Sequence, residues 1–432
     1  MQAIEDSAVS GERVMIQVHA LAHGGAGIGR PVDPDDTKTW LVAGALPGER
    51  ILASRAREER RLVRGELATV VEAGPLRVTP PCALAPVCGG CNWQHVDPAQ
   101  QLELKRAIVA GQLRRVTDRV VAAPSRGAPL GYRRRARLHY ARDGSDGLLL
   151  GFFRARSREV IDAPDCPVLD GPLRHAFAKV RALAPHLPRD GEIFGLSDGA
   201  RAVLGVPGVR ADAIIEEAAR ALLDGILVGV ELRGGRRRVS VGAPTLDLDG
   251  AALPPVTASP FVFAQAQEAQ NAALVEHVAR VARGRGARVL ELHAGAGNFT
   301  RALAREAVKV LAIDEDREAI GRLQALATRT GLKITTRVAR VEAALSRLCR
   351  LGRSYPVVVL DPPRRGLGMA AAKNLAAIAS DRIVYVSCDP ATLARDLAVL
   401  VEAGLRIEQV TVFDMMPMTS EVEAVAVLSR RP

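Results

Sequence analysis

Three segments with chemically capable residues each follow a run of residues that favours a buried β-strand. Cys388 follows the run from Ile383 to Ser387, and Asp361 follows the run from Val357 to Leu360. A glycine-rich turn, residues 293–298, follows a third run, residues 288–292. In open α/β sheets, ligands bind at the carboxyl ends of the strands. These patterns predict one sheet edge that carries a thiol nucleophile, an acid and a cofactor loop.

The glycine-rich turn indicates which kind of cofactor this edge binds. Gly295 and Gly297 allow a tight turn and close approach of the backbone to a ligand. Asp314 ends the next apolar run, where a ribose-binding carboxylate is expected. Thr300 stands where pyrophosphate-binding folds need a small residue, so S-adenosylmethionine, which has no phosphate, fits better than NAD. Taken alone, the turn is equally compatible with an ordinary connection between a strand and a helix.

The sequence Asp361-Pro-Pro-Arg364 has two interpretations within methyl transfer. Amino-group methyltransferases carry a similar turn followed by an aromatic residue that stacks on the target base, but here Arg364 follows. A thiol on the next predicted strand favours covalent catalysis, in which the Cys388 thiolate adds to an electron-poor ring carbon. The alternative for Cys388 is a small buried hydrophobe, the commonest state of a free cysteine. Its position at a strand end before Asp-Pro favours the catalytic interpretation.

These segments resemble those of the RNA uracil-5 methyltransferases, and the resemblance extends over nearly the whole chain. Residues 357–367 and 384–397 are similar to the two signature segments of that family, with Cys388 at the nucleophile position. Residues 417–423, PMTSEVE, resemble its closing motif, in which the glutamate at the position of Glu423 is the general base. The resemblance implies that Cys388 adds to carbon 6 of uracil, carbon 5 takes the methyl group, and Glu423 removes the carbon 5 proton. It also places Asp361 on the substrate and cofactor side of the pocket.

The resemblance extends to the residues around S-adenosylmethionine, where this chain departs from the family at several positions. The predicted cofactor-binding set is Gln265, His293, Gly295, Gly297, Asn298, Asp314 and Asp361. The departures are Gln267 in place of Asn, His293 in place of an aromatic residue, Arg340 in place of an Asp or Asn near the adenine, and Met418 and Glu421 in place of two histidines of the closing motif. Glu421 is therefore a second candidate for the base.

Four further cysteines have the spacing of a metal site. Cys82, Cys88 and Cys91 lie within ten residues, and Cys166 stands much later in Asp-Cys-Pro. This pattern favours a soft metal over a disulfide framework in a chain without a signal-like start. Four thiolates are a generic zinc site, but the spacing resembles that of the iron-sulfur branch of the family. We therefore predict a 4Fe-4S cluster with a structural role, held by these four cysteines.

The charge of the chain agrees with an RNA substrate. Its 59 Lys and Arg residues exceed the 48 Asp and Glu residues, and the resulting net charge of +11 favours a polyanionic partner. Arginines cluster at residues 133–135 and again at residues 236–238. On a strand, Arg133 and Arg135 would share one face and Arg134 would lie on the other, so not all of them are expected to contact RNA. The second cluster is as compatible with a solvated hairpin as with phosphate contacts.

Length and turn residues predict a multidomain α/β protein with three parts. Residues 11–73 alternate apolar and polar side chains in short runs, which predicts a small β-barrel, and their glycine-rich segments resemble the TRAM domain, an RNA-binding barrel of the oligonucleotide-binding type. Residues 74–257 are predicted to form a central α+β domain with the iron-sulfur loop and helices at 98–113, 173–183 and 212–223. Residues 258–432 alternate strands and helices, as in a doubly wound, Rossmann-like methyltransferase domain.

Three hypotheses about function remain at this point. The favoured one is an RNA uridine-5 methyltransferase, acting on large-subunit ribosomal RNA in preference to transfer RNA because the barrel and cluster occur together. The second is a catalytically silent RNA-binding iron-sulfur protein, motivated by Arg340 and the missing histidines. The third is an amino-group methyltransferase that uses Asp361-Pro-Pro363 and does not need Cys388. No run of 18 apolar residues occurs, so we expect a protein that does not span a membrane. A cytoplasmic location is the default expectation and agrees with a thiol-ligated cluster, and we also expect a monomer.

Overall fold

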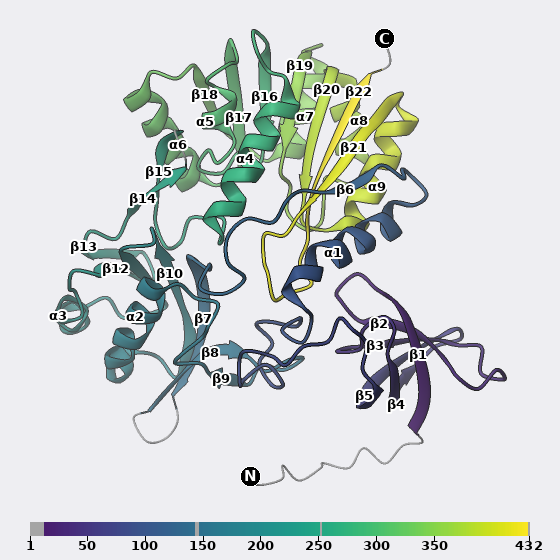
Figure 1. Ribbon diagram of the computed structural model, residues 1–432. Coiled ribbons are helices and arrows are strands. Elements are labelled where there is room, and N and C mark those ends of the chain that lie inside the picture. Colours follow the sequence, from purple (N-terminus) through teal and green to yellow (C-terminus); the bar gives the residue numbers. More distant parts are fainter. Residues whose placement is uncertain (1–12, 143–146, 251–252, 431–432) are drawn as a thin grey trace.

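The computed structural model describes residues 13–142, 147–250 and 253–430 (Figure 1). Residues 11, 12, 143–146, 251, 252, 431 and 432 of the predicted domain ranges lie outside the described residues. A barrel and a central sheet lie on the same side of a large C-terminal sheet that is flanked by helices. This arrangement leaves the lower edge of the C-terminal sheet facing the other two parts.

The N-terminal part is a closed barrel with the strand order β1-β2-β3-β5-β4, as the sequence predicts. Its strands are β1 (Arg13–Leu21), β2 (Gly27–Pro31), β3 (Thr39–Val42), β4 (Arg50–Glu58) and β5 (Leu62–Glu72). The sequence does not predict β2, because its glycines are typical of a turn. Gly29 instead allows β2 to approach β1, since a Cβ atom there would lie 2.4 Å from Ile16 Cγ2.

The central part contains a seven-stranded sheet with the order β13-β12-β11-β10-β7-β8-β9. Its strands are β7 (Arg135–Arg142), β8 (Leu148–Phe153), β9 (Val160–Asp162), β10 (Asp190–Ser197), β11 (Ala202–Pro207), β12 (Leu227–Gly234) and β13 (Arg237–Gly242). Helices α2 (Gly171–Val180), η1 (Arg181–His186) and α3 (Ala213–Ala221) pack on it. The predicted helix 173–183 therefore ends early as an α-helix and continues as a 3-10 helix, in which Pro185 cannot donate a backbone hydrogen bond.

The C-terminal part is an eight-stranded sheet with the order β18-β17-β16-β19-β20-β22-β21-β6. Its strands are β16 (Arg288–Leu292), β17 (Lys309–Asp314), β18 (Ile334–Val338), β19 (Tyr355–Leu360), β20 (Ala379–Ser387), β21 (Leu405–Phe413), β22 (Glu423–Arg430) and β6 (Val120–Ala122). Strands β16 to β20 run parallel, whereas β22 is antiparallel to both of its neighbours. A two-stranded ribbon of β14 (Leu246–Gly250) and β15 (Leu253–Ala258) precedes this sheet in the chain.

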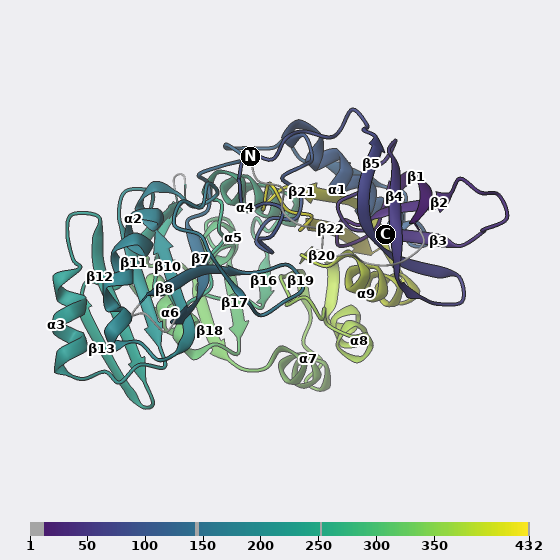
Figure 2. The same ribbon diagram turned by 90° about the horizontal axis from the view of Figure 1, so that it is seen from below.

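Helices cover both faces of this sheet (Figure 2). They are α4 (Glu268–Ala282), α5 (Thr300–Leu303), α6 (Arg317–Thr330), α7 (Val341–Arg350), α8 (Met369–Ile378) and α9 (Pro390–Glu402). Successive residues of a strand face opposite sides. Val357 and Val359 accordingly pack in the core with α4 and α5, while Val358 and Leu360 pack with α7, α8 and α9. The doubly wound arrangement that the sequence predicts is present.

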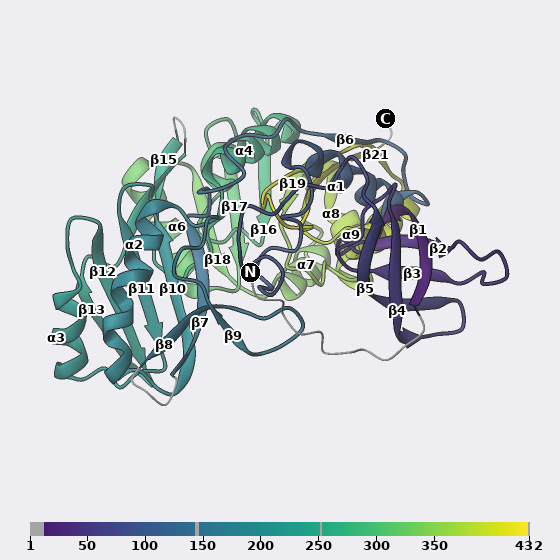
Figure 3. The ribbon, with the colours of Figure 1, turned by 60° about the horizontal axis from the view of Figure 1, so that its bottom comes forward.

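Helix α1 (Pro98–Leu113) and strand β6 join the C-terminal layer although they precede the central sheet in sequence. β6 pairs in parallel with β21, and Val109 and Leu113 of α1 pack in the same core as α8 and α9. α1 and β21 also lie close together in two views (Figures 1 and 3). The segment after the cysteine loop is therefore fixed against the strands that lead to Glu423.

In the described part of the chain, no helix combines the length and the apolar character that crossing a membrane requires.

Candidate active site

The strand order brings the predicted nucleophile, acid and base to one edge of the C-terminal sheet. Asp361 follows β19 and Cys388 follows β20, which are parallel neighbours. Glu423 is the first residue of β22, and the ladder between β20 and β22 ends with Ser387 opposite Ala424. One residue further in this antiparallel register, Cys388 stands opposite Glu423.

Glu423 has the environment of a carboxyl group that can exchange a proton. It is 7% exposed, and its Oε1 atom meets no hydrogen-bond partner among the described residues. Burial, followed by the charges of Asp361 and Glu421, raises the pKa of Glu423 well above its usual value. A raised pKa brings a carboxyl group closer to the range in which general acid-base catalysis works at neutral pH.

Glu421, the second candidate for the base, is occupied by an ion pair. It lies in the loop before β22 rather than on the strand, and it pairs with Arg364 of the Asp-Pro-Pro-Arg turn. Its side chain is 38% exposed. The geometry therefore favours Glu423 over Glu421 as the base.

The thiol of Cys388 is not activated in advance by its surroundings. Burial, followed by the charges of Glu423 and Asp361, raises its pKa to about 12, and Arg364 acts in the opposite direction. A thiol with that pKa is almost entirely protonated at neutral pH. The proton must consequently leave as the sulfur attacks.

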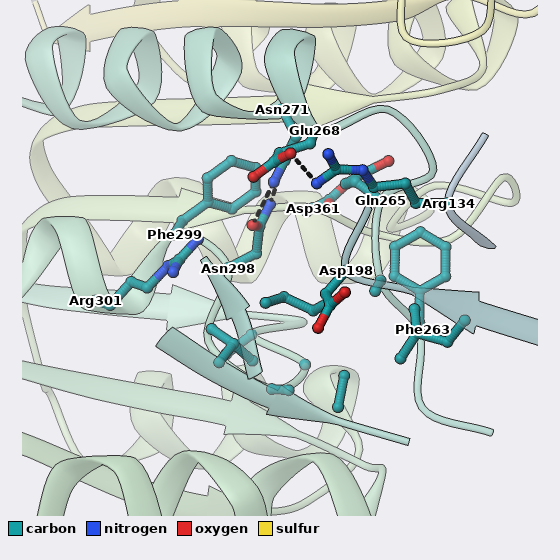
Figure 4. Close-up of a pocket in the computed structure, with 18 of the residues that line it drawn as sticks. Arg134, Asp198, Phe263, Gln265, Glu268, Asn271, Asn298, Phe299, Arg301 and Asp361 are labelled. Atoms are coloured by element: carbon teal, nitrogen blue, oxygen red, sulfur yellow. Dashed lines mark hydrogen bonds and ion pairs between the residues drawn. The ribbon is translucent and has the colours of Figure 1, made fainter. Parts of the chain in front are cut away.

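A cavity of about 110 Å³, partly open to solvent, lies beside Asp361 at the ends of β16 and β19 (Figure 4). The predicted cofactor residues that line it are Gln265, His293, Gly295, Asn298 and Asp361. Burial, followed by the charge of Asp314, raises the pKa of Asp361 to about 7. A cationic ligand would favour the ionised form of such a carboxyl group, which suits a sulfonium compound better than a phosphate.

Asp314 holds the start of the glycine turn. The backbone N–H of Gly295 donates to Asp314 Oδ2 at 2.9 Å. A Cβ atom at Gly295 would have no atom within 4 Å, whereas at Gly297 it would lie 2.6 Å from Leu323 Cδ1. Gly295 thus leaves space on the cavity side, and Gly297 allows the turn to pack against α6. Asp314 and Gly297 themselves lie next to the cavity lining.

Several cavity residues are not predicted from the sequence. Arg134 forms an ion pair with Glu268, and the side-chain amides of Asn271 and Asn298 exchange two hydrogen bonds of 2.9 Å (Figure 4). Glu268 and Asn271 are three residues apart on α4 and share a face of the helix, so helical spacing offered a signal for this pair. Asp198 comes from the central sheet, and nothing in its local sequence points to the cavity.

Comparisons with known proteins decide which family shares this geometry. Residues 258–431 match the family model described as tRNA (Uracil-5-)-methyltransferase. The 23S rRNA (uracil(1939)-C(5))-methyltransferase RlmD of Halomonas elongata is 34% identical over 99% of this chain and 91% of its own length. The enzyme of the same name from Pseudomonas putida is 35% identical over 93% of this chain and 91% of its own length.

The chain belongs to the RNA uracil-5 methyltransferase family. A crystal structure of the Pyrococcus abyssi tRNA (uracil-54, C5)-methyltransferase in complex with S-adenosyl-L-homocysteine has the same fold, with a TM-score of 0.74, 23% identity, and coverage of 96% of this chain and 99% of that one. The resemblance predicted from the sequence motifs is therefore confirmed.

The four predicted metal ligands of this uracil-5 methyltransferase line one small cavity. Cys82, Cys88, Cys91 and Cys166 surround it together with Phe152. Burial raises the pKa of Cys91 to about 11. No group of three or more His, Cys, Asp or Glu side chains in the described ranges is gathered closely enough for a single metal ion.

A basic groove of the uracil-5 methyltransferase lies between the cysteine loop and the ion pair of Arg364 with Glu421. Arg133, Arg135 and Arg137 line it, and it ends at Arg364 and Glu421. Arg134 faces the cofactor cavity instead, as the alternation of a strand predicts. Burial and the neighbouring arginines lower the pKa of Arg135 to about 10, because like charges are crowded here. Such crowding favours a polyanion in the groove.

The second arginine cluster differs from this groove. It lies in the hairpin between β12 and β13, where Arg237 pairs with Glu216 and Arg238 pairs with Glu231. The departure at Arg340 precedes α7, and that side chain is exposed. Neither observation gives these residues a role in catalysis.

Proposed function

We propose that this uracil-5 methyltransferase forms 5-methyluridine in 23S ribosomal RNA, with Cys388 as nucleophile and Glu423 as base. The observation that carries the proposal is the register of β20 and β22, which sets Cys388 opposite Glu423 beside the cavity with Asp361. Full-length similarity to two enzymes named for 23S rRNA supports the ribosomal target. The likeness to the transfer RNA enzyme, at 23% identity, supports the fold alone.

The chemistry assigns one task to each side chain. Cys388 gives its thiol proton to solvent water as its sulfur forms a bond with carbon 6 of uracil. The π electrons of the double bond between carbons 5 and 6 move onto carbon 5 and oxygen 4, which makes carbon 5 nucleophilic. S-adenosylmethionine bound in the cavity supplies an electrophilic methyl group. Glu423 then removes the proton from the methylated carbon 5, the bond between carbon 6 and sulfur breaks, and the cysteine is regenerated. Without a base at Glu423, the last step has no acceptor for the proton.

The cavity fits S-adenosylmethionine by its donor set. Asp361 would favour the positive sulfonium, Gln265 and Asn298 offer amide groups, and the Gly295 turn leaves room for close backbone contact. Asp314, which holds the Gly295 backbone, is proposed for the ribose hydroxyls. His293 completes the lining, and Gly297 shapes the turn.

We also propose that Cys82, Cys88, Cys91 and Cys166 hold a 4Fe-4S cluster. A single zinc ion needs all four sulfur atoms about 2.3 Å from one point, and the described side chains are not gathered that closely. All four thiols line one shared cavity, which suits a cluster because its iron atoms bind the sulfur atoms without bringing them to one point. Such a cluster would stabilise the loop between the barrel and α1, away from the reacting atoms.

We further propose a domain organisation, a cellular location and a binding partner for the chain. The barrel at 11–73 is proposed as a TRAM domain that contacts RNA, with a central domain at 74–257 and a catalytic domain at 258–432. We expect a cytoplasmic monomer that binds ribosomal RNA, with transfer RNA as the alternative substrate.

The proposal is tested by methylation of purified RNA. The protein should transfer a methyl group to 23S ribosomal RNA from a strain that lacks the gene, and not to bulk transfer RNA from that strain. Mapping should place 5-methyluridine at one position. If neither RNA is methylated and RNA labelled with tritium at carbon 5 of uracil releases none, the chain is a silent RNA-binding protein.

A further inference from the structure

The loop that leads to Glu423 is held mainly by residues outside the C-terminal sheet. This loop, residues 414–422, is called the base loop here, and it descends from β21 and returns to β22 (Figure 1). Lys105 of α1, which is fully buried, donates to Asp414 Oδ1 at 2.6 Å and to the backbone oxygen of Met416 at 3.0 Å. The Tyr132 hydroxyl donates to the backbone oxygen of Pro417 at 3.0 Å.

Met418 is the strained point of the base loop. Its φ of +66° lies in the left-handed region, which residues other than glycine rarely adopt. Such a conformation persists only where the surroundings hold it. Both backbone polar groups of Met418 are held: its N–H donates to Gln101 Oε1 at 2.7 Å, and its oxygen accepts from the Trp93 N–H at 3.0 Å.

Gln101 connects the base loop to the cysteine loop. Its side chain is fully buried, and its Nε2 atom donates to the backbone oxygens of Trp93 and Val96 at 3.2 and 3.0 Å. Trp93 is only two residues after Cys91. One amide group therefore ties the segment after the cysteines to the residue that shapes the approach to Glu423.

We propose that Gln101 is a positioning residue for the general base: by holding Met418, it keeps Glu423 directed at the carbon 5 proton. The inference rests on the proposed function. Gln101 is fully buried and lines neither the basic groove nor the cofactor cavity, so its loss should slow the elimination step and leave the addition of the thiol and RNA binding intact. A misplacement of about 1 Å in a catalytic group reduces its rate by on the order of 100-fold.

The test compares Gln101→Met with a matched control, Gln270→Met. Gln270 is also a fully buried glutamine on a helix, and it also bonds to backbone groups of another segment, at Arg126 and Pro124. The methylated protein-RNA adduct should accumulate in Gln101→Met on ordinary substrate and decay roughly 10- to 100-fold more slowly than in the wild type. Trapping by RNA with 5-fluorouridine, and RNA affinity, should stay within about threefold. Gln270→Met should release its adduct at the wild-type rate.

Amide hydrogen exchange supplies a readout that does not depend on activity. Exchange in residues 414–422 should increase in Gln101→Met and not in Gln270→Met. Gln101→Glu, which when protonated keeps an acceptor and a donor, should restore most of the release rate. If Gln101→Met does not fold, Gln101→Asn, whose shorter side chain cannot reach the backbone N–H of Met418 with the same amide group, should show the same slow release.

Distinct results would overturn the inference. Release at the wild-type rate in Gln101→Met, an equal loss of addition and release, or the same defect in Gln270→Met would each show that Gln101 does not act on the base. The proposed function fails separately, if the wild-type protein forms neither 5-methyluridine nor an adduct. In that case hydrogen exchange still reports whether Gln101 holds the base loop.

Discussion

Replacing Glu423 by glutamine removes the proposed base with little change in shape. The carboxyl group is buried opposite Cys388, and one of its oxygens has no partner in the described structure. The neutral amide should therefore fit without leaving a charge unpaired. Addition of the thiol and methyl transfer should continue, while elimination should stall because the carbon 5 proton has no acceptor.

The expected size of this effect follows from the surroundings of Glu423. General base catalysis contributes about 10²- to 10⁴-fold, or about 2.7 to 5.5 kcal/mol. Glu421 is held by Arg364 and is not free to replace Glu423. Burial of the site also limits replacement by a water molecule. We expect a decrease in turnover on the order of 10³-fold, in the middle of that range.

Glu421→Gln is the matched control. This substitution deletes the negative charge of Glu421, which raises the pKa values of Cys388 and Glu423. It also releases Arg364, whose positive charge lowers the same two pKa values. Its turnover should stay within about tenfold of the wild type. Elimination by the wild type should accelerate with rising pH, since the base must be ionised and its pKa is raised. Glu423→Gln should lose this dependence.

Denaturing gels of reactions with ordinary RNA measure the covalent adduct directly. Adduct should accumulate with Glu423→Gln and disappear rapidly with Glu421→Gln. The opposite pattern would transfer the role of base to Glu421. Wild-type turnover by Glu423→Gln would refute the reasoning from burial and register altogether.

Three further predictions concern the nucleophile, the cluster and a buried acid. Cys388→Ala should lose methylation and adduct formation but bind RNA in filter assays within about threefold of the wild type, because affinity comes mostly from phosphate contacts; retained turnover would exclude covalent catalysis. Protein purified without oxygen should be brown, with about four iron atoms per chain by metal analysis, and Cys88→Ser should be colourless; one zinc per chain would mean the wrong metal. Burial raises the pKa of Glu291 from 4.5 to about 8 in the folded protein. The free energy of unfolding is therefore greatest at acid pH, where this carboxyl group is protonated in both states. It should fall as the pH rises from 4.5 to 8, by at most about 5 kcal/mol, because the unfolded chain loses this proton first. In denaturant unfolding without cofactor, Glu291→Gln should flatten this decline, and unchanged pH dependence would contradict the assignment.

Residues within a single segment were sufficient to predict the helix at 98–113 and the strands that precede Asp361 and Cys388. The helix at 98–113 is bounded as predicted, because Asp97 caps its first turn and Pro98 suits the first helical position. The runs before Asp361 and Cys388 consist of apolar residues, as strands buried on both faces require. The sequence therefore predicted that Asp361 and Cys388 stand at strand ends, and the types of these two residues indicated their chemistry.

Other elements depend on partners that are distant in sequence. β6 is three residues long, and only its pairing with β21, nearly 300 residues later, makes it a strand. The ion pair of Arg134 with Glu268 spans 134 residues and forms because the central sheet meets the C-terminal one. Such contacts are set by packing between parts of the chain, so a pattern within one segment does not reveal them.

The surroundings of Cys388 explain why the residue types alone did not predict its chemical state. A catalytic cysteine is expected to have a lowered pKa, yet here burial and the charges of Glu423, Asp361 and Glu421 raise the pKa of Cys388, and Arg364 opposes them. Burial and the charge of Asp361 also raise the pKa of Glu423, since a nearby negative charge disfavours ionisation. The thiol of Cys388 is therefore largely protonated in the free protein at neutral pH, and burial disfavours the ionised form of Glu423. A cationic cofactor beside Asp361 would shift this balance toward the ionised forms, so we expect Cys388 to react more readily once the cavity is filled.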